Sequence, residues 1–116
     1  MGRELFTFIE TKWFSKRIGE LLSDDEYAQM QWRLIQIPDI GDVIPGGGGI
    51  RKFRHSVKSK GKRGGARVIY YYAVSLEQIF MLEIYTKNEM SDITLPRLRE
   101  LKKLVDEWVK DGQRKI

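Results

Sequence analysis

Basic residues without nearby counter-charges fill one window of the sequence. Between Asp42 and Glu77 there is no acidic residue, and the window holds eight basic side chains: Arg51, Lys52, Arg54, Lys58, Lys60, Lys62, Arg63 and Arg67. Their mutual repulsion destabilises a fold unless an anion is bound there. Phosphate groups are such anions, and their contacts with lysine and arginine release counterions. The window therefore predicts a site for an acidic polymer, and we favour RNA.

Two of these cations lie inside predicted strands. Alternation along a strand places Lys52 and Arg54 on one face and points Phe53 to the core. Arg67 opens a second strand and is expected on the cationic face as well. A sheet with cations on one face and core on the other would be an open platform, and we expect the site there. The loop 58–63 fits a solvated basic loop nearly as well as an RNA contact.

Three other features could contribute to a reaction or to binding, but the sequence gives weaker evidence for them. Tyr71 could stack on a base, although a run of three tyrosines is more typical of strand packing. His55 is the only histidine, so a pair of catalytic histidines is excluded, and we expect it at the surface. No Gly-Lys-Ser/Thr follows Gly46–Gly49, which excludes a P-loop and indicates a hinge or spacer.

Composition narrows the class of protein. The chain has 116 residues, of which 41% are hydrophobic, and a net charge of +5. This length predicts one domain over residues 1–116, and no apolar run is long enough for a membrane helix. There is no cysteine, so disulfides and thiolate zinc sites are excluded, and no acidic cluster has metal-ligand spacing. We expect a cytoplasmic protein without a metal or another cofactor.

The first third of the chain predicts a strand and two helices. Residues Leu5–Glu10 have strand composition and nearly alternate. A first helix is expected to open at Thr11 or Ser15. Ser23-Asp-Asp-Glu26 has the pattern of a capping box and predicts the start of a second helix, which Pro38 ends.

The rest predicts three strands and a helix after the linker Ile40–Gly49. The strands are Ile50–His55, Arg67–Val74 and Ile79–Lys87, and the helix runs over Leu95–Asp111 and ends at Gly112. Alternation in the last strand predicts that two sets of side chains lie on opposite faces of the sheet: Phe80, Leu82 and Ile84 on one, and Met81, Glu83 and Tyr85 on the other. The order β-α-α-β-β-β-α predicts the α+β class.

Three segments together resemble the RelE/ParE superfamily of bacterial toxins. They are Gly41–Arg54, with Pro-Gly-Gly-Gly-Gly-Ile-Arg-Lys-Phe-Arg, then Gly61–Tyr72, with Gly-Lys-Arg-Gly-Gly-Ala-Arg, and Ile84–Asp92. The branch that the chain resembles most is the HigB-type toxins, and the resemblance covers nearly the whole chain. It implies a twisted, mainly antiparallel, four-stranded sheet with helices packed on one side.

The resemblance also implies an activity, the cleavage of mRNA in the ribosomal A site. The ribose 2′-OH would attack the adjacent phosphate without a metal, with a 5′-OH as the leaving group. Matching of the motifs implies catalytic roles for Lys52, Arg54, Arg67, Lys87 and Asn88. Implied RNA contacts are Arg51, Lys58, Lys60, Lys62, Arg63, Tyr71 and Tyr85.

The general base stays open between Lys52 and Lys87, and either would need a lowered pKa, which the crowding of cations would supply. Asn88 stands where well-studied members carry an arginine. No tyrosine follows Asp92 where some members place a catalytic one, and Tyr85 is the nearest candidate.

The resemblance implies partners too. A cognate antitoxin, of the helix-turn-helix type, would cover the cations, and the complex would reach operator DNA through the antitoxin. Two other functions remain open: a ParE-like gyrase poison, and a non-catalytic protein that binds RNA or the ribosome.

Overall fold

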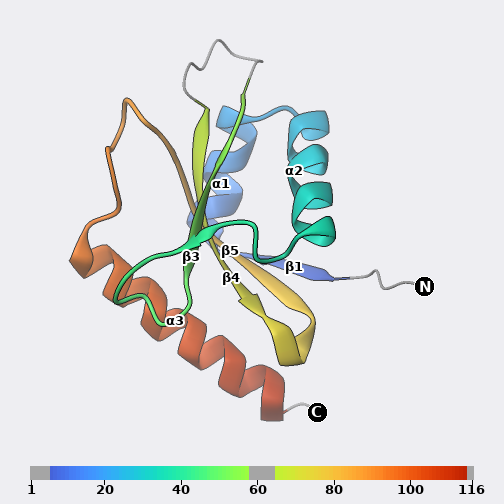
Figure 1. Ribbon diagram of the computed structural model, residues 1–116, viewed down its shortest axis with the longest axis vertical. Coiled ribbons are helices and arrows are strands. Elements are labelled where there is room, and N and C mark those ends of the chain that lie inside the picture. The colour runs from blue at the N-terminus through green and yellow to red at the C-terminus, as the bar shows by residue number, and fades with distance from the viewer. Residues whose placement is uncertain (1–5, 58–64, 115–116) are drawn as a thin grey trace.

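The computed structural model describes residues 6–57 and 65–114, and its elements follow the predicted order with one addition. In chain order they are β1 (Thr7–Glu10), α1 (Lys12–Leu21), α2 (Asp24–Gln36), β2 (Asp42–Val43), β3 (Arg51–His55), β4 (Ala66–Ala73), a 3-10 turn (Val74–Leu76), β5 (Gln78–Thr86) and α3 (Leu95–Arg114). The α+β class is confirmed (Figure 1).

The strands form one sheet in the order β1-β5-β4-β3-β2. β1 runs parallel to β5, and the other neighbours are antiparallel. The sheet thus has five strands and not the predicted four. The additional strand, β2, lies in the predicted linker, where Asp42 and Val43 pair with Lys52 and Arg51. Two residues are too few to display alternation, so only pairing with β3 reveals the strand.

Side-chain caps fix where the helices begin. The Thr11 hydroxyl accepts a hydrogen bond from the Phe14 backbone N–H at 3.0 Å, which places the start of α1. At α2 the Ser23 hydroxyl accepts from the Glu26 N–H, while the Glu26 carboxylate accepts from the Ser23 N–H. This reciprocal pair is the predicted capping box, and it satisfies N–H groups that lack partners within the helix.

The helices cover both faces of the sheet, so the implied one-sided packing is wrong. Phe14 of α1 and Met30 of α2 are buried with Val68, Tyr70 and Met81. On the other face, α3 buries residues of a second cluster: Leu98, Leu101 and Val105, against Ile69, Phe80 and Leu82. In Figure 1, α3 crosses the strands at one end, apart from α1 and α2. β5, buried on both sides, therefore carries apolar residues at nearly every position.

A register shift changes the alternation of β5. Ile69 of β4 pairs with Glu83, but the next residue, Tyr70, pairs with Met81, which leaves Leu82 between them. After this bulge, Ile84 joins the α1–α2 cluster with Met81, and Tyr85 joins the α3 cluster with Leu82. The predicted alternation of two triplets is therefore wrong beyond Leu82, because a bulge adds one residue and shifts the phase of the side chains.

The last helix begins where predicted and ends later. The Thr94 hydroxyl accepts a hydrogen bond from the Arg97 N–H, and Pro96 lies in the first turn. Gly112 does not end α3, which continues to Arg114. It has no positive φ, which a terminating glycine would need. Instead, a Cβ at Gly112 would lie 2.6 Å from a Leu76 methyl group, so this glycine lets the helix approach the 3-10 turn closely.

Candidate nucleic-acid interface

Three side chains from three neighbouring strands form a row across the sheet. Arg54 of β3 lies directly opposite Arg67 of β4, and Arg67 lies directly opposite Tyr85 of β5. Side chains at such paired positions share a face, with Cβ atoms about 4.5–5.5 Å apart. Tyr85 belongs to the α3 cluster, so the row Arg54–Arg67–Tyr85 is on the face that α3 packs against.

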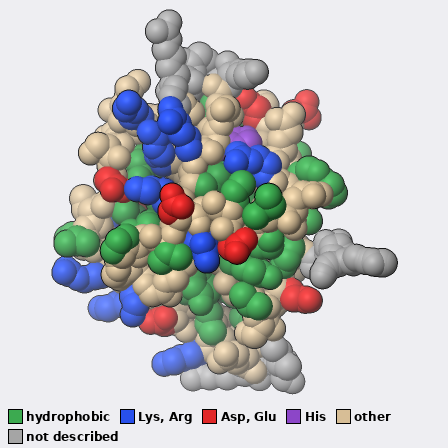
Figure 2. Space-filling model, in the orientation of Figure 1, with side chains coloured by type: hydrophobic (Ala, Val, Ile, Leu, Met, Phe, Trp, Pro, Cys, Tyr) green, Lys and Arg blue, Asp and Glu red, His purple; other side chains and the backbone are tan. Residues whose placement is uncertain are grey.

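The row lies at the end of that face which α3 leaves uncovered. Ile69, two residues after Arg67 on β4, is fully buried in the α3 cluster. Arg67 is half-buried and Arg54 is exposed. The predicted open platform is thus wrong in extent, since only one end of the face is accessible. Figure 2 shows lysine and arginine side chains gathered there, beside the ends of β3 and β4 nearest residues 57 and 65.

Lys52 lies beside the row and is joined to Asp92. Its ammonium nitrogen is 3.0 Å from the Asp92 carboxylate, in the segment between β5 and α3. The hydrogen bond from Lys52 is the main reason that the pKa of Asp92 is below its usual value. No counter-charge was expected near the basic window in the sequence, and the one that Lys52 finds comes from a distant segment.

Asp92 is the residue that reasoning from sequence missed. It is 40 positions from Lys52, and no local pattern indicates contact over such a separation. Its backbone neighbour Ile93 also donates an N–H to the Asp92 carboxylate at 2.9 Å. Two donors thus fix the carboxylate in the position where it meets Lys52.

Tyr85 is buried, with 3% of its surface exposed. Among the described residues its hydroxyl oxygen has no hydrogen-bond partner. Burial, followed by the nearby Asp92 carboxylate, raises the pKa of Tyr85. The charge of Arg67 and the nearby backbone N–H of Ile93, which does not reach hydrogen-bond geometry with the hydroxyl, act in the opposite direction. The phenol is therefore protonated at neutral pH. It cannot serve as the expected exposed RNA contact without movement of what covers it.

Lys87 and Asn88 directly follow β5 and are both exposed. The turn that carries them is held by hydrogen bonds from the Thr86 N–H to the Glu89 carboxylate at 2.8 Å and from the Glu89 N–H to the Thr86 carbonyl at 3.1 Å. Glu89 also forms an ion pair with Arg17 of α1. Lys87 and Asn88 thus stand beside the row on a turn anchored to both β5 and α1.

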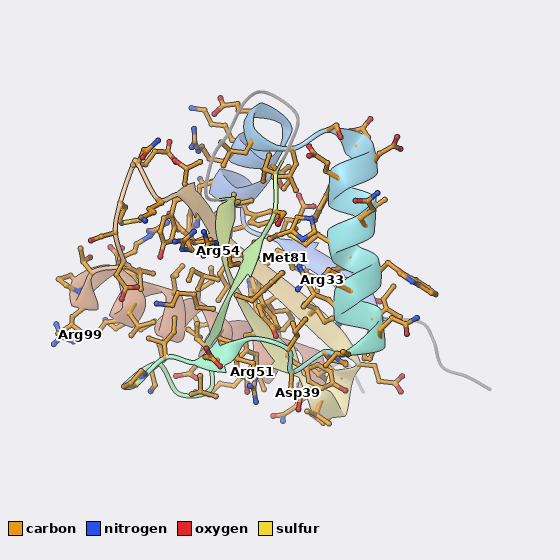
Figure 3. The ribbon with its side chains drawn as sticks, turned by 45° about the horizontal axis from the view of Figure 1, so that its top comes forward. Arg33, Asp39, Arg51, Arg54, Met81 and Arg99 are labelled. Atoms are coloured by element: carbon orange, nitrogen blue, oxygen red, sulfur yellow. The ribbon has the colours of Figure 1, made fainter. Side chains whose placement is uncertain are left out.

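Arg51 and His55 lie on the opposite face of the sheet from the row. Arg51 donates to the Gly41 carbonyl at 2.7 Å, and Figure 3 shows it near Asp39, away from Arg54. The structure does not bring Arg51 to the predicted RNA site. It fastens the turn after α2, as does the Tyr70 hydroxyl, which donates to the Pro38 carbonyl at 2.8 Å.

His55 is buried, and the expectation of a surface position is wrong. Its Nδ1 atom lies 2.9 Å from an Arg33 guanidinium nitrogen of α2. Because a guanidinium can only donate, Nδ1 accepts this hydrogen bond. Burial first, and the positive charge of Arg33 second, lower the pKa of His55. The neutral ring thus connects β3 to α2 and takes no part in the row.

The remaining predicted contacts divide into two groups. Tyr71 is half-buried in the α3 cluster, where its ring stacks on Phe80 with centroids 6.0 Å apart. It packs the sheet as a strand residue and offers no free platform for a base. The other four, Lys58, Lys60, Lys62 and Arg63, lie outside the described residues.

Two features are absent from the part of the chain that the structure describes. In residues 6–57 and 65–114 no three histidine, aspartate or glutamate side chains gather in a way that could hold a metal ion. Over the same ranges no helix combines the length and the apolar character needed to cross a membrane.

Comparisons with known proteins agree with this fold. The family model of the RelE toxin of the RelE/RelB toxin–antitoxin system matches residues 8–116. Among solved structures, the chain is similar to an arginine-to-alanine double mutant of the E. coli toxin RelE in the free state. The TM-score is 0.53 at 13% identity, over 74% of this chain and 87% of that one. At this identity the structural similarity shows the fold, and the family match extends over the row and its surroundings.

Proposed function

The chain belongs to the family of RelE toxins of toxin–antitoxin systems, and from that premise we propose that it is an endoribonuclease that cleaves mRNA on the ribosome and so inhibits translation. The observation that carries this proposal is the row Arg54–Arg67–Tyr85 with Lys52 beside it, on the accessible end of the sheet. Two guanidinium groups from adjacent strands can bind one phosphate together, because the planar arrangement of their N–H donors allows paired hydrogen bonds to the phosphate oxygens.

In the proposed reaction the 2′ oxygen of a ribose attacks the adjacent phosphorus atom and the bond from phosphorus to the 5′ oxygen breaks. The products are a 2′,3′-cyclic phosphate and a 5′-hydroxyl. Negative charge grows on the non-bridging oxygens in the transition state, and in this proposal Arg54 and Arg67 stabilise it. Because these cations supply the positive charge, the proposed reaction needs no metal.

A base must remove the proton from the 2′-OH, and Lys52 and Lys87 remain the candidates. A lysine acts as a base only as the neutral amine. Lys52 is engaged in an ion pair with the Asp92 carboxylate at 3.0 Å. Lys87 is exposed and forms no ion pair with the residues that the structure describes. We therefore favour Lys87 as the base and Lys52 as a phosphate contact, with Asn88 as a neutral hydrogen-bonding neighbour.

The family also implies a cognate antitoxin. We propose that the antitoxin covers the row with acidic groups or a packed helix, since cations that bind phosphate also bind carboxylates. Binding of operator DNA would then be a property of the complex, contributed by the antitoxin.

The test is primer extension on a defined mRNA incubated with the purified protein, with and without programmed ribosomes, and with EDTA in the ribosome-free arm. We expect cuts at the A-site codon only when ribosomes are present. Arg67→Ala should lower the cleavage rate by about 10²–10³-fold. Arg99→Ala, which removes an exposed arginine far from Arg54 (Figure 3), is the matched control and should cleave like the wild type.

The outcomes separate the functions that the sequence leaves open. Absence of cuts in both arms overturns the proposal and favours gyrase poisoning or passive RNA binding. Equal losses in Arg67→Ala and Arg99→Ala would show that general positive charge, and not the row, supports cleavage.

A further inference from the structure

The unpartnered hydroxyl of Tyr85 has no role in the reaction as described above. A buried hydroxyl without a hydrogen-bond partner costs stability, and such groups are rare in folded proteins. Among the described residues the Tyr85 oxygen is the only buried side-chain polar atom in this condition. It is also next in the row to Arg67, on the same face and opposite it in register. The ring that carries this hydroxyl is thus a direct neighbour of one of the two arginines that are proposed to bind the phosphate.

The segment between β5 and α3 packs beside Tyr85. Met90 and Ile93 of that segment pack into the same cluster as Tyr85. Asp92 lies between them, near enough for its charge to influence the phenol, and is held by Lys52 at 3.0 Å. Asp92 and Lys52 are both partly exposed, and such an ion pair is weak in water. A phosphate that bound Lys52 would compete with the carboxylate for the same ammonium group.

From this arrangement, and resting on the proposed function, we propose that the Tyr85 hydroxyl donates the proton to the leaving 5′ oxygen when an RNA phosphate displaces Asp92 from Lys52. The 2′ oxygen forms its bond to phosphorus, the bond to the 5′ oxygen breaks, and the phenol proton passes to that oxygen. The resulting phenolate lies opposite Arg67 and regains a proton from water. Departure of Asp92 removes a charge that disfavours the phenolate, whereas Arg67 remains to stabilise it.

The test uses two RNA substrates on programmed ribosomes, one with the natural 5′ oxygen at the cleaved bond and one with sulfur in its place. A thiolate leaves without a proton because thiols are far more acidic than alcohols. Tyr85→Phe should cleave the oxygen substrate about 10²-fold or more slowly than the wild type. On the sulfur substrate its rate should be within a few fold of the wild type. Arg67→Ala should be slow on both substrates.

The matched control is Tyr72→Phe, which removes the hydroxyl of a half-buried tyrosine whose ring packs on Phe6 on the opposite face. It should cleave both substrates like the wild type. Tyr85→Phe keeps the buried ring and removes only the orphan hydroxyl, so its melting temperature should equal or exceed that of the wild type. Its affinity for ribosomes should be unchanged.

Two results overturn the role of Tyr85 while the proposed function stands. Either Tyr85→Phe matches the wild type on the oxygen substrate, or it is equally slow on both substrates while the wild type cleaves them. A wild-type protein that cleaves neither substrate overturns the proposed function, and this inference with it.

Discussion

At the scale of single residues, neighbouring side chains of strand β3 point to opposite faces of the sheet and have different roles. Phe53 and His55 face the two N-terminal helices and are buried, while Lys52 and Arg54 face the other side and the accessible end of the sheet. Because side chains alternate strictly along a strand, a slip of one residue would exchange the two sets. Burial of Phe53 and His55 therefore determines that Lys52 and Arg54 reach the face of the sheet where the phosphate is proposed to bind.

His55 gives the first prediction, which concerns the pH dependence of stability. Burial and Arg33 lower the pKa of His55 in the folded protein, whereas in the unfolded chain it is about 6.5. Below that pH the unfolded state binds a proton that the folded state resists, so the free energy of unfolding should fall as pH drops from 7 towards 5. Urea unfolding at a series of pH values measures it.

The variant His55→Gln keeps an acceptor for Arg33 and removes the titration. Its free energy of unfolding should depend less on pH between 7 and 5 than that of the wild type. The protein has no other histidine, so a variant that loses stability over this range as steeply as the wild type would show that His55 is not the cause.

At the scale of elements, the pairing of β3 with β4 sets Arg54 opposite Arg67, and the backbone beside this pairing depends on Gly65. This residue has a φ of +73°. A Cβ placed there would lie 2.5 Å from the His55 carbonyl oxygen, a backbone atom that no side-chain movement can clear. The two strands can thus approach only if position 65 has no side chain.

Gly65→Ala should therefore be destabilising, by about 2 kcal/mol or more, since it combines the cost of a left-handed conformation with a backbone collision. The loss should appear in thermal or urea unfolding. Gly46→Ala is the matched control, because Gly46 has a φ of +80° but no atom within 4 Å of the added Cβ. It should lose only the conformational part, about 1 kcal/mol. Equal losses in the two variants would contradict the collision at Gly65.

How much of these elements could be predicted from sequence depended on whether their signals are local. The capping box at Ser23 and the stop at Pro38 act within one turn of helix, and the structure has α2 where they place it. β2 and the bulge at Leu82 are defined by pairing with a neighbouring strand. Such pairing cannot be predicted from the local periodicity of the sequence. The same holds for the face that α3 covers, which depends on how the chain returns over the sheet.

The candidate site follows the same division. Alternation along β3 was enough to group Lys52 with Arg54, and the register of β3 and β4 brings Arg67 beside them. The Lys52–Asp92 ion pair joins segments 40 residues apart. The burial of Tyr85 arises from the phase shift at the bulge together with the packing of Met90 and Ile93. Contacts of this kind exist only in the folded chain.

At the scale of the whole molecule, charge is distributed unevenly between the two faces. The first turn of α2 carries Asp24, Asp25 and Glu26, and this helix packs on the face opposite the row. Several other cations serve internal contacts, such as Arg97, which binds Glu83 at 2.8 Å and Glu100 at 3.1 Å. Lys52, Arg54 and Arg67 lie together at the accessible end of the sheet, and this group of cations should direct a polyanion to that end.

This asymmetry predicts how RNA binding responds to salt. The affinity for a short single-stranded RNA, measured by fluorescence anisotropy, should fall linearly with the logarithm of salt concentration, and each phosphate contact adds about 0.7 to the slope. Arg54→Ala should lower the slope by about that amount. Lys52→Ala should lower it less, because Asp92 competes for the same ammonium group. Arg99→Ala removes the same charge from α3 and should leave the slope unchanged. If Arg54→Ala and Arg99→Ala reduced the slope equally, RNA would be held by the overall charge of the molecule and not by the row.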